Sequence, residues 1–487
     1  MIVIAALFSL TLTSSQFAGE DELLVLSRAE AIITYSKAIK VSDLIRGNFS
    51  ATSDFIWTLI SFNQPPARQL ISIPFINYID NAEKALRLPN IIFWIGTVIV
   101  GFRIGSKLSG QWCGFLSGLY LAGSGLFTFS GLAHSFGYYS FWIMIFVFHR
   151  MKNHVIEIGT NTGIKNFFFG NMCLFMAFLG FQSALPIVFI YNLMYIVNYI
   201  IEVRKGNASG IKRLWLFVPI FLIYGFYFAF FYGLPAYLIS IGKAPFYFGQ
   251  LDQLLGRQSI AYINYTSFLI NLKAINGYFF PFFSWFLLII GTCYLYKYSS
   301  KLFILLIPQA LLFSFYFVGS TQEHFSVFFI WIIPMAVAGS INWFGKYSRA
   351  AFLLFFIPIY FWTYEMHVKK YTENDYPSYS HSNIHMKVNK VRPIKEIVMD
   401  IKNLLHKDMR YVVFVDGAIP LYYFKSSNYI ILPEEFRNLK YLCDQFKNFL
   451  SKENVKLAIV REQNFCDPIV SYRKNYAGSK IDLVVFE

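Results

Sequence analysis

Charge is scarce in this chain. Asp, Glu, Lys and Arg together make up 14% of its 487 residues, whereas a soluble protein carries about a quarter. Apolar residues make up 56% and aromatic residues 20%, and the mean hydropathy is +0.48. Most of the chain must therefore face lipid or other apolar helices. We predict a polytopic α-helical membrane protein.

Cysteine and histidine are also few. The five cysteines and eight histidines form no ligand pattern for a metal cluster. Cys113, Cys173 and Cys293 lie in apolar segments and are interpreted as packing residues. The net charge of +15 does not indicate a nucleic-acid partner, because Lys and Arg cluster in short loops between apolar segments and no nucleic-acid-binding motif is present.

Long apolar runs dominate the first three quarters of the chain. Runs of about 20 residues predict about eleven transmembrane helices. The first and fourth are short for a full span, which indicates a late start of the sequence or helices that pack inside the protein. The predicted spans are residues 1–15, 88–106, 112–130, 135–149, 166–183, 185–202, 214–236, 277–296, 302–319, 325–344 and 350–365.

Basic residues predict the orientation of these spans. Every second loop carries Lys or Arg, from Lys107 to Lys346 and Arg349, whereas the short turns between those loops carry none. Cytoplasmic loops are the ones enriched in Lys and Arg, so we expect a cytoplasmic N-terminus. A secretory signal peptide is the alternative for the first segment, although it lacks a positive n-region. The outer side then holds residues 16–87, 238–275 and 366–487.

The tail changes character after about residue 366. "RYVVFV", "NYIIL", "VKLAIV" and "IDLVVF" read as strands, and "RPIKEIVMDIKNLLHK" and "PEEFRNLKYLCDQFKNFL" read as helices. This alternation predicts an external soluble α/β domain over 366–487, after a transmembrane module over 1–365. The tail has no glycine-rich phosphate loop and no nucleophile motif, so we interpret it as a structural or acceptor-binding module.

The outer segment 16–87 holds an ordered series of motifs. Asp21 and Glu22 follow the first apolar run, and a stretch with apolar spacings of three and four then predicts a helix lying in the interface. Pro65-Pro66 fixes a turn, and Arg87-Leu88-Pro89 leads into the second span. Carboxylates are costly near hydrocarbon, so anchoring alone explains the acids poorly.

This order of motifs resembles the GT-C superfamily of membrane glycosyltransferases, in particular the bacterial protein-mannosyltransferase-like and lipid A aminoarabinose transferase branch. "GSKLSGQWCGFLSGLYLAGSGLFTFSGLAHSFGYYSF" and "EHFSVFFIWIIP" are similar to later spans of that family. The chain departs from the family pattern at Asn63-Gln64, where His or Lys is common, and at Ala133-His134, where Ala-Arg is usual.

The resemblance implies transfer of a sugar from a polyprenyl-phosphate donor to an acceptor hydroxyl at the outer face. Such a reaction needs a base for the acceptor proton and positive charge for the departing phosphate. We assign Asp21 as the base, with Glu22 as a second catalytic candidate that could instead only orient a partner. The candidates for donor-phosphate binding are Arg68, Arg87, His134, Lys243 and Arg257. No cofactor is firmly implied, and a divalent metal stays open.

Each of these residues also has a structural interpretation. The acids could be a solvated helix start, and Arg87 could anchor the second span at the lipid headgroups. His134 could be a satisfied interfacial histidine. Lys243 and Arg257 could bind membrane lipids at their headgroups.

The main rival function is a transporter or flippase of a lipid-linked sugar. That class expects charged or broken helices at mid-membrane depth, and the predicted spans carry few charges. A scaffold protein would leave the acids without a role. The acceptor could be lipid A, another surface glycan or a protein, and the sequence names neither it nor the sugar.

Cys443 and Cys466 lie in the part of the chain that we expect to be external. Disulfides persist in such compartments, so we hypothesise a bridge between these two cysteines, with two free thiols as the alternative.

The predicted orientation can be tested by cysteine-accessibility labelling in intact cells. A cysteine placed in the tail should react with a membrane-impermeant reagent before permeabilisation, because the tail is expected outside. A cysteine next to Lys346 should react only after permeabilisation. The reverse pattern would overturn the assignment of both sides.

Overall fold

The computed structural model describes two compact units, one formed by Met1–Thr13 with Val25–Val368 and the other by Ser14–Leu24 with Lys369–Glu487. Each unit is considered by itself. The described residues are 1–11, 20–60, 65–126, 136–152, 161–205, 215–243, 250, 284–316 and 327–365, and in the tail 410–413, 429–431, 448, 451–452, 455–461, 470–476 and 481–486.

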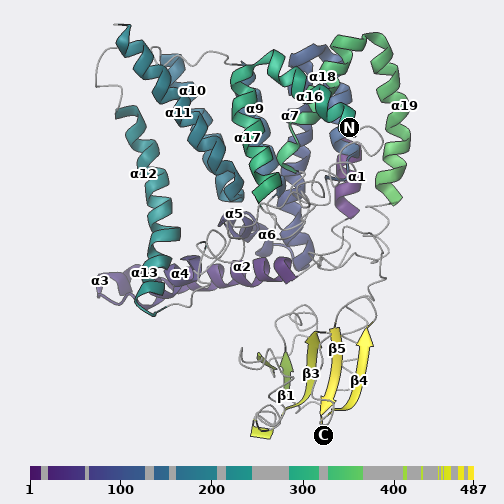
Figure 1. Cartoon of the computed structure of the whole chain (residues 1–487). Helices are drawn as coiled ribbons and strands as arrows, with labels where there is room; N and C mark the ends of the chain where they lie inside the picture. The colour runs from purple at the N-terminus through teal and green to yellow at the C-terminus, as the bar shows by residue number, and fades with distance from the viewer. Residues whose placement is uncertain are drawn as a thin grey trace. The chain divides into compact units, whose positions relative to one another are not determined.

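Among the described residues, six helices precede residue 82. They are α1 (Ile2–Thr11), α2 (Glu20–Ala38), α3 (Val41–Ile45), α4 (Ser50–Ile60), α5 (Ala67–Leu70) and α6 (Ile73–Ile76). Figure 1 shows α2, α3 and α4 lying across the long helices rather than along them. α2 buries Val25, Leu26, Ala29 and Ile32, which share one face at helical spacing, as expected for an interfacial helix.

Helix α7 (Ala82–Gly123) is a tight hairpin of two arms. Its N-terminus is capped by Asn81, whose Oδ1 accepts a hydrogen bond from the Lys84 amide at 2.9 Å. The direction reverses at Ser109 and Gly110, where Gly110 has a φ of 82° that glycine adopts at little cost. The predicted spans 88–106 and 112–130 thus overlap the two arms, and the turn lies just after Lys107.

Glycines allow the two arms of α7 to touch. A Cβ atom on Gly105 would meet Ser117, and one on Gly114 would meet Ser106 and the backbone oxygen of Phe102. Small residues at a spacing of four are typical of close helix contacts in membranes. The hairpin is tied to the neighbouring helix α18 (Ile332–Phe344) by a 2.7 Å hydrogen bond from Ser109 Oγ to Asn342 Oδ1.

The remaining helices complete the bundle. They are α9 (Phe136–Lys152), α10 (Asn161–Gly180), the 3-10 turn η2 (Gln182–Ala184), α11 (Leu185–Arg204), α12 (Phe217–Phe228), the π-helical segment η4 (Ala229–Gly233), α13 (Leu234–Ser240), α16 (Ser284–Tyr298), α17 (Ser300–Tyr316) and α19 (Lys346–Thr363). α7 packs against α1, α9 and α18, and α16 packs against α18. Each segment predicted from an apolar run overlaps one of these helices or an arm of α7.

Four helical segments in the described part are long and apolar enough to cross a membrane: Ala82–Gly123, Gly163–Gly180, Gln182–Arg204 and Phe217–Ser240. α12 directs Phe221, Leu222 and Phe226 outward, each at least 60% exposed. A helix with such a surface needs an apolar surrounding, so the protein is membrane-embedded. The count of about eleven spans stays a prediction.

Two of the three cysteines interpreted as packing residues are buried, namely Cys113 and Cys173. Cys293 is exposed on α16, so the prediction for this residue was wrong. An apolar run does not reveal which face of its helix turns toward lipid, and a thiol is tolerated on either face. Cys443 and Cys466 lie outside the described residues.

The tail contains a five-stranded sheet in the order β2-β1-β3-β5-β4. β1 (Arg410–Val413) is parallel to β2 (Tyr429–Ile431) and β3 (Val455–Arg461), whereas β5 (Ile481–Phe486) is antiparallel to β3 and to β4 (Val470–Tyr476). Strands β1, β2, β3 and β5 coincide with the four apolar runs read as strands. The two predicted tail helices lie almost entirely outside the described residues, so the α/β character of the tail stays a prediction.

The close contact between the two arms of α7 can be tested by replacing a glycine at the contact. Gly114→Leu should destabilise the protein by about 1–3 kcal/mol, because the new side chain would meet the backbone of Phe102. Gly225→Leu is the matched control, since nothing lies within 4 Å of a Cβ atom at that helical glycine. Thermal unfolding in detergent should give a clearly lower melting temperature for Gly114→Leu alone. Equal melting temperatures would contradict the close packing.

Candidate functional site

Aromatic rings gather where α9 begins and α10 ends. The ring centroids of Phe136 and Phe181 lie 5.1 Å apart, and Tyr139 lies 6.2 Å from Phe181 and 5.7 Å from Phe328. Phe181 follows the last residue of α10, and Phe136 is the first residue of α9. We call these four rings the aromatic cluster.

Arg68 meets this aromatic cluster from α5. The short helix follows Pro65 and Pro66, and Pro66 is its N-cap, so the double proline sets where the helix begins. Arg68 is 5% exposed, and its guanidinium carbon lies 5.9 Å from the centroid of the Phe136 ring. The neighbouring Gln69 is fully buried, and its amide has no hydrogen-bond partner among the described residues.

Arg87 lies in the first turns of α7, the helix against which α6 packs, and α5 directly precedes α6. Ser72 Oγ connects these elements, because it lies 3.4 Å from the Arg68 carbonyl oxygen and 3.5 Å from that of Leu86. Asn90 Nδ2 also lies 3.5 Å from the Leu86 carbonyl oxygen. Arg87 itself is completely buried. Two buried guanidinium groups therefore belong to helices that are linked through Ser72.

The burial of Arg87 argues against the alternative that it anchors a span at lipid headgroups. An anchoring arginine buries its aliphatic stem and keeps its charged end in water. At 0% exposure the guanidinium of Arg87 is enclosed by protein. Enclosing a charge costs several kcal/mol unless it meets polar or charged partners, so such a residue needs a specific reason to be there.

Three glutamines add amides near the aromatic cluster, and two of them, Gln250 and Gln309, are buried. Gln309 of α17 donates to the hydroxyl of Tyr139 at 3.1 Å. Gln250 is fully buried, and its Oε1 accepts from the Tyr227 hydroxyl at 2.9 Å and from Gln182 Nε2 at 3.4 Å. These residues were not predicted from the sequence. The available signal is an amide inside an apolar stretch, as in "LIPQALL" and "FLGFQSALP".

The structure describes the other predicted site residues only in part. Asp21 and Glu22 belong to the first turn of α2, and their side chains are outside the description. His134 and Arg257 lie outside the described residues. Lys243 is exposed just after α13.

The arrangement suits an anion with several oxygen atoms. A guanidinium presents up to five N–H donors in a fixed plane, which matches phosphate better than an ammonium does. Aromatic faces beside it can hold an apolar or sugar-like face. In the described portion no three His, Cys, Asp or Glu side chains come together as a metal site would require.

The whole chain resembles solved membrane proteins in its fold. It aligns with ArnT from Cupriavidus metallidurans, bound to undecaprenyl phosphate, at a TM-score of 0.58 and 10% identity over 99% of this chain and 96% of that one. It also aligns with the archaeal oligosaccharyltransferase AglB from Archaeoglobus fulgidus, in complex with an inhibitory peptide and a dolichol-phosphate, at a TM-score of 0.50 and 13% identity over 94% of this chain and 69% of that one.

No family model matches the chain, and no curated protein matches it by sequence. The evidence for the fold is therefore the structural alignment alone. This fold agrees with the family that the order of motifs indicated. The chain has the fold of the GT-C membrane glycosyltransferases.

Proposed function

We propose that this protein is a membrane glycosyltransferase that moves a sugar from a polyprenyl-phosphate donor to an acceptor hydroxyl on the outer face of a bacterial inner membrane. The observation that carries the proposal is the GT-C fold over almost the full length of the chain, with two buried arginines behind the double-proline turn. The acceptor is lipid A, another surface glycan or a protein.

Arg68 and Arg87 hold the donor phosphate in this proposal. As the bond between the sugar carbon and the phosphate oxygen breaks, the leaving phosphate gains negative charge. Guanidinium groups in a site shielded from water stabilise that charge more strongly than they would at an exposed surface. The burial of both residues supports this role. Lys243, His134 and Arg257 are proposed as additional positive charge near the lipid phosphate.

Asp21 acts as the general base. It takes the proton of the acceptor hydroxyl while the oxygen attacks the sugar carbon, and the lipid phosphate leaves with the electrons of the broken bond. Glu22 orients Asp21 or the acceptor. A carboxylate pair at the start of an interfacial helix would meet acceptors that arrive from the aqueous side.

The distribution of buried charge speaks against a transporter. The buried charged side chains in the described part are Arg68, Glu83, Arg87 and Arg150. Glu83, Arg87 and Arg150 lie within two turns of an end of α7 or α9, and Arg68 lies in the short helix α5. A transporter of a charged lipid-linked sugar would need charged groups or broken helices at mid-membrane depth.

Mass spectrometry of lipid A, surface glycans and exported proteins, with and without the gene, would identify the reaction. The loss of one sugar mass from one of these fractions would name the sugar and the acceptor together. Unchanged masses in all three fractions would count against a transferase.

Asp21→Asn should fold and bind donor but lose transfer, because an amide cannot accept the proton. General-base catalysis is typically worth about 10²–10⁴-fold, so the loss should be large. Glu22→Gln should lose less. The assay is transfer of radiolabelled sugar from polyprenyl phosphate in membranes, with expression matched to wild type. Near-normal transfer by Asp21→Asn would contradict the general-base role. Asp21 and Glu22 would then be interpreted as a solvated helix start.

Arg87→Gln should weaken donor binding as well as turnover, because it removes one buried charge-assisted contact, worth about 1.5–3 kcal/mol. Lys301→Gln is the matched control, since it removes the same charge from an exposed position of α17 that has no part in the proposed site. Binding of fluorescent polyprenyl phosphate to the purified proteins should drop about tenfold or more for Arg87→Gln and much less for Lys301→Gln. A larger loss in Lys301→Gln would contradict the assignment.

A further inference from the structure

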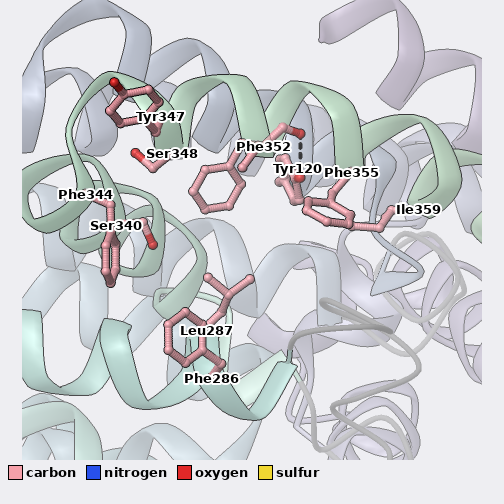
Figure 2. A pocket seen from close by; sticks show the side chains of 11 residues that line it. Tyr120, Phe286, Leu287, Ser340, Phe344, Tyr347, Ser348, Phe352, Phe355 and Ile359 are labelled. Atoms are coloured by element: carbon pink, nitrogen blue, oxygen red, sulfur yellow. Dashed lines mark hydrogen bonds between the residues drawn. The ribbon is translucent and has the colours of Figure 1, made fainter.

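A groove lies between α16, α18, α19 and the second arm of α7. Its volume is about 310 Å³, at the lower end of the range for ligand pockets. Figure 2 shows Tyr120 of α7 at its wall, where the Tyr120 hydroxyl donates to the Phe352 carbonyl oxygen at 2.6 Å. The other lining residues are Phe286, Leu287, Ser340, Phe344, Tyr347, Ser348, Ala351, Phe355 and Ile359. The lining is almost entirely apolar.

The helices around the groove expose apolar side chains. On α19, Leu354 is 70%, Ile357 57% and Phe361 62% exposed, and Phe286 of α16 is 55% exposed. In a membrane-embedded protein, surfaces of this kind face lipid chains. The groove is therefore continuous with an apolar surface that lipid covers.

Positive charge lies at one end of the groove. α18 and α19 join at Gly345, and Lys346 and Arg349 flank the lining residues Tyr347 and Ser348. Arg349 is half-buried, and its Nε is buried with no hydrogen-bond partner among the described residues. The sequences of α16, α18 and α19 contain no Asp or Glu. This basic end has no carboxylate of its own elements to neutralise it.

The basic end of the groove is distant from the proposed donor site. Ser109 is bonded to Asn342 near the α18–α19 junction, and 22 residues of α7 separate Ser109 from Arg87. A helix rises 1.5 Å per residue, so the two ends of this arm are about 33 Å apart. One lipid phosphate cannot meet both Arg87 and Arg349.

We propose that this groove binds an anionic phospholipid, with an acyl chain against Phe352 and Ala351 and the phosphate at Arg349 and Lys346. Charge complementarity selects an anionic headgroup, and the apolar lining selects the chain. The Lys346 ammonium, which lies 5.6 Å from the ring centroid of the lining residue Tyr347, and the Arg349 guanidinium donate to the phosphate oxygens. The bound lipid fills the space between α18 and α19 and stabilises their packing.

The test uses the purified full-length protein in detergent, with phosphatidylglycerol, phosphatidylcholine or polyprenyl phosphate added. Thermal unfolding is the readout, because a ligand that binds the folded state raises the melting temperature. Phosphatidylglycerol should raise the melting temperature of the wild type more than phosphatidylcholine does. This readout needs no sugar transfer, so its outcome is separate from that of the proposed reaction.

Two pairs of variants locate the binding. Arg349→Gln should weaken the effect of phosphatidylglycerol about tenfold or more in lipid concentration, whereas Lys301→Gln, at an exposed position of α17, should not. Ala351→Trp fills the groove and should abolish the effect, whereas Ala350→Trp, at the exposed neighbouring position, should keep it. If Ala351→Trp fails to fold, the Arg349→Gln pair decides.

An equal stabilisation by both phospholipids would overturn the proposal, as would a full effect in Arg349→Gln. Polyprenyl phosphate could instead raise the melting temperature more than phosphatidylglycerol does, and lose this effect in Arg349→Gln. That result would overturn the proposal and identify the donor lipid as the ligand of the groove.

Discussion

Hydrocarbon cannot hydrogen-bond, and this constraint determines where polar chemistry lies in the protein. Every backbone group within the bilayer must be satisfied inside the fold, which is why the membrane unit is helical. Charged side chains are tolerated near helix ends or inside protein, and the four buried ones in the described part follow that rule. The arginines behind the double-proline turn are the clearest case, because their cost must be offset by partners that hold them in place.

The same constraint explains the close packing of the α7 hairpin. Lipid tails are as apolar as leucine, so helices in a membrane gain little from the hydrophobic effect and associate through close contact. Gly105 and Gly114 let the two arms approach until backbone and small side chains touch. That rigid pair fixes the position of Arg87 at one end and of the contact with α18 at the other.

Much of the bundle could be predicted from the sequence because apolar runs are long and basic residues are few. The runs overlap the described helices. Arg68 and Arg87 were selected as candidates because they stand beside Pro65-Pro66 and before Leu88-Pro89. The glutamines were missed because their partners are distant in sequence: Gln309 is 170 residues from Tyr139, and Gln250 is 68 from Gln182. Strand β4 was missed because "VSYRKNY" carries two basic residues, a feature of edge strands that hides the apolar alternation.

The buried arginines offer a physical explanation for the departures from the family pattern. Asn63 and Gln64 precede the double proline where a His or Lys is common, so this turn carries less positive charge than the family pattern has. Arg68 follows the same turn after two residues and is buried against an aromatic ring. A charge shielded from water acts more strongly on a phosphate than an exposed one does. In the proposed reaction, fewer cations at this turn can therefore stabilise the leaving lipid phosphate, provided that they are enclosed as Arg68 and Arg87 are.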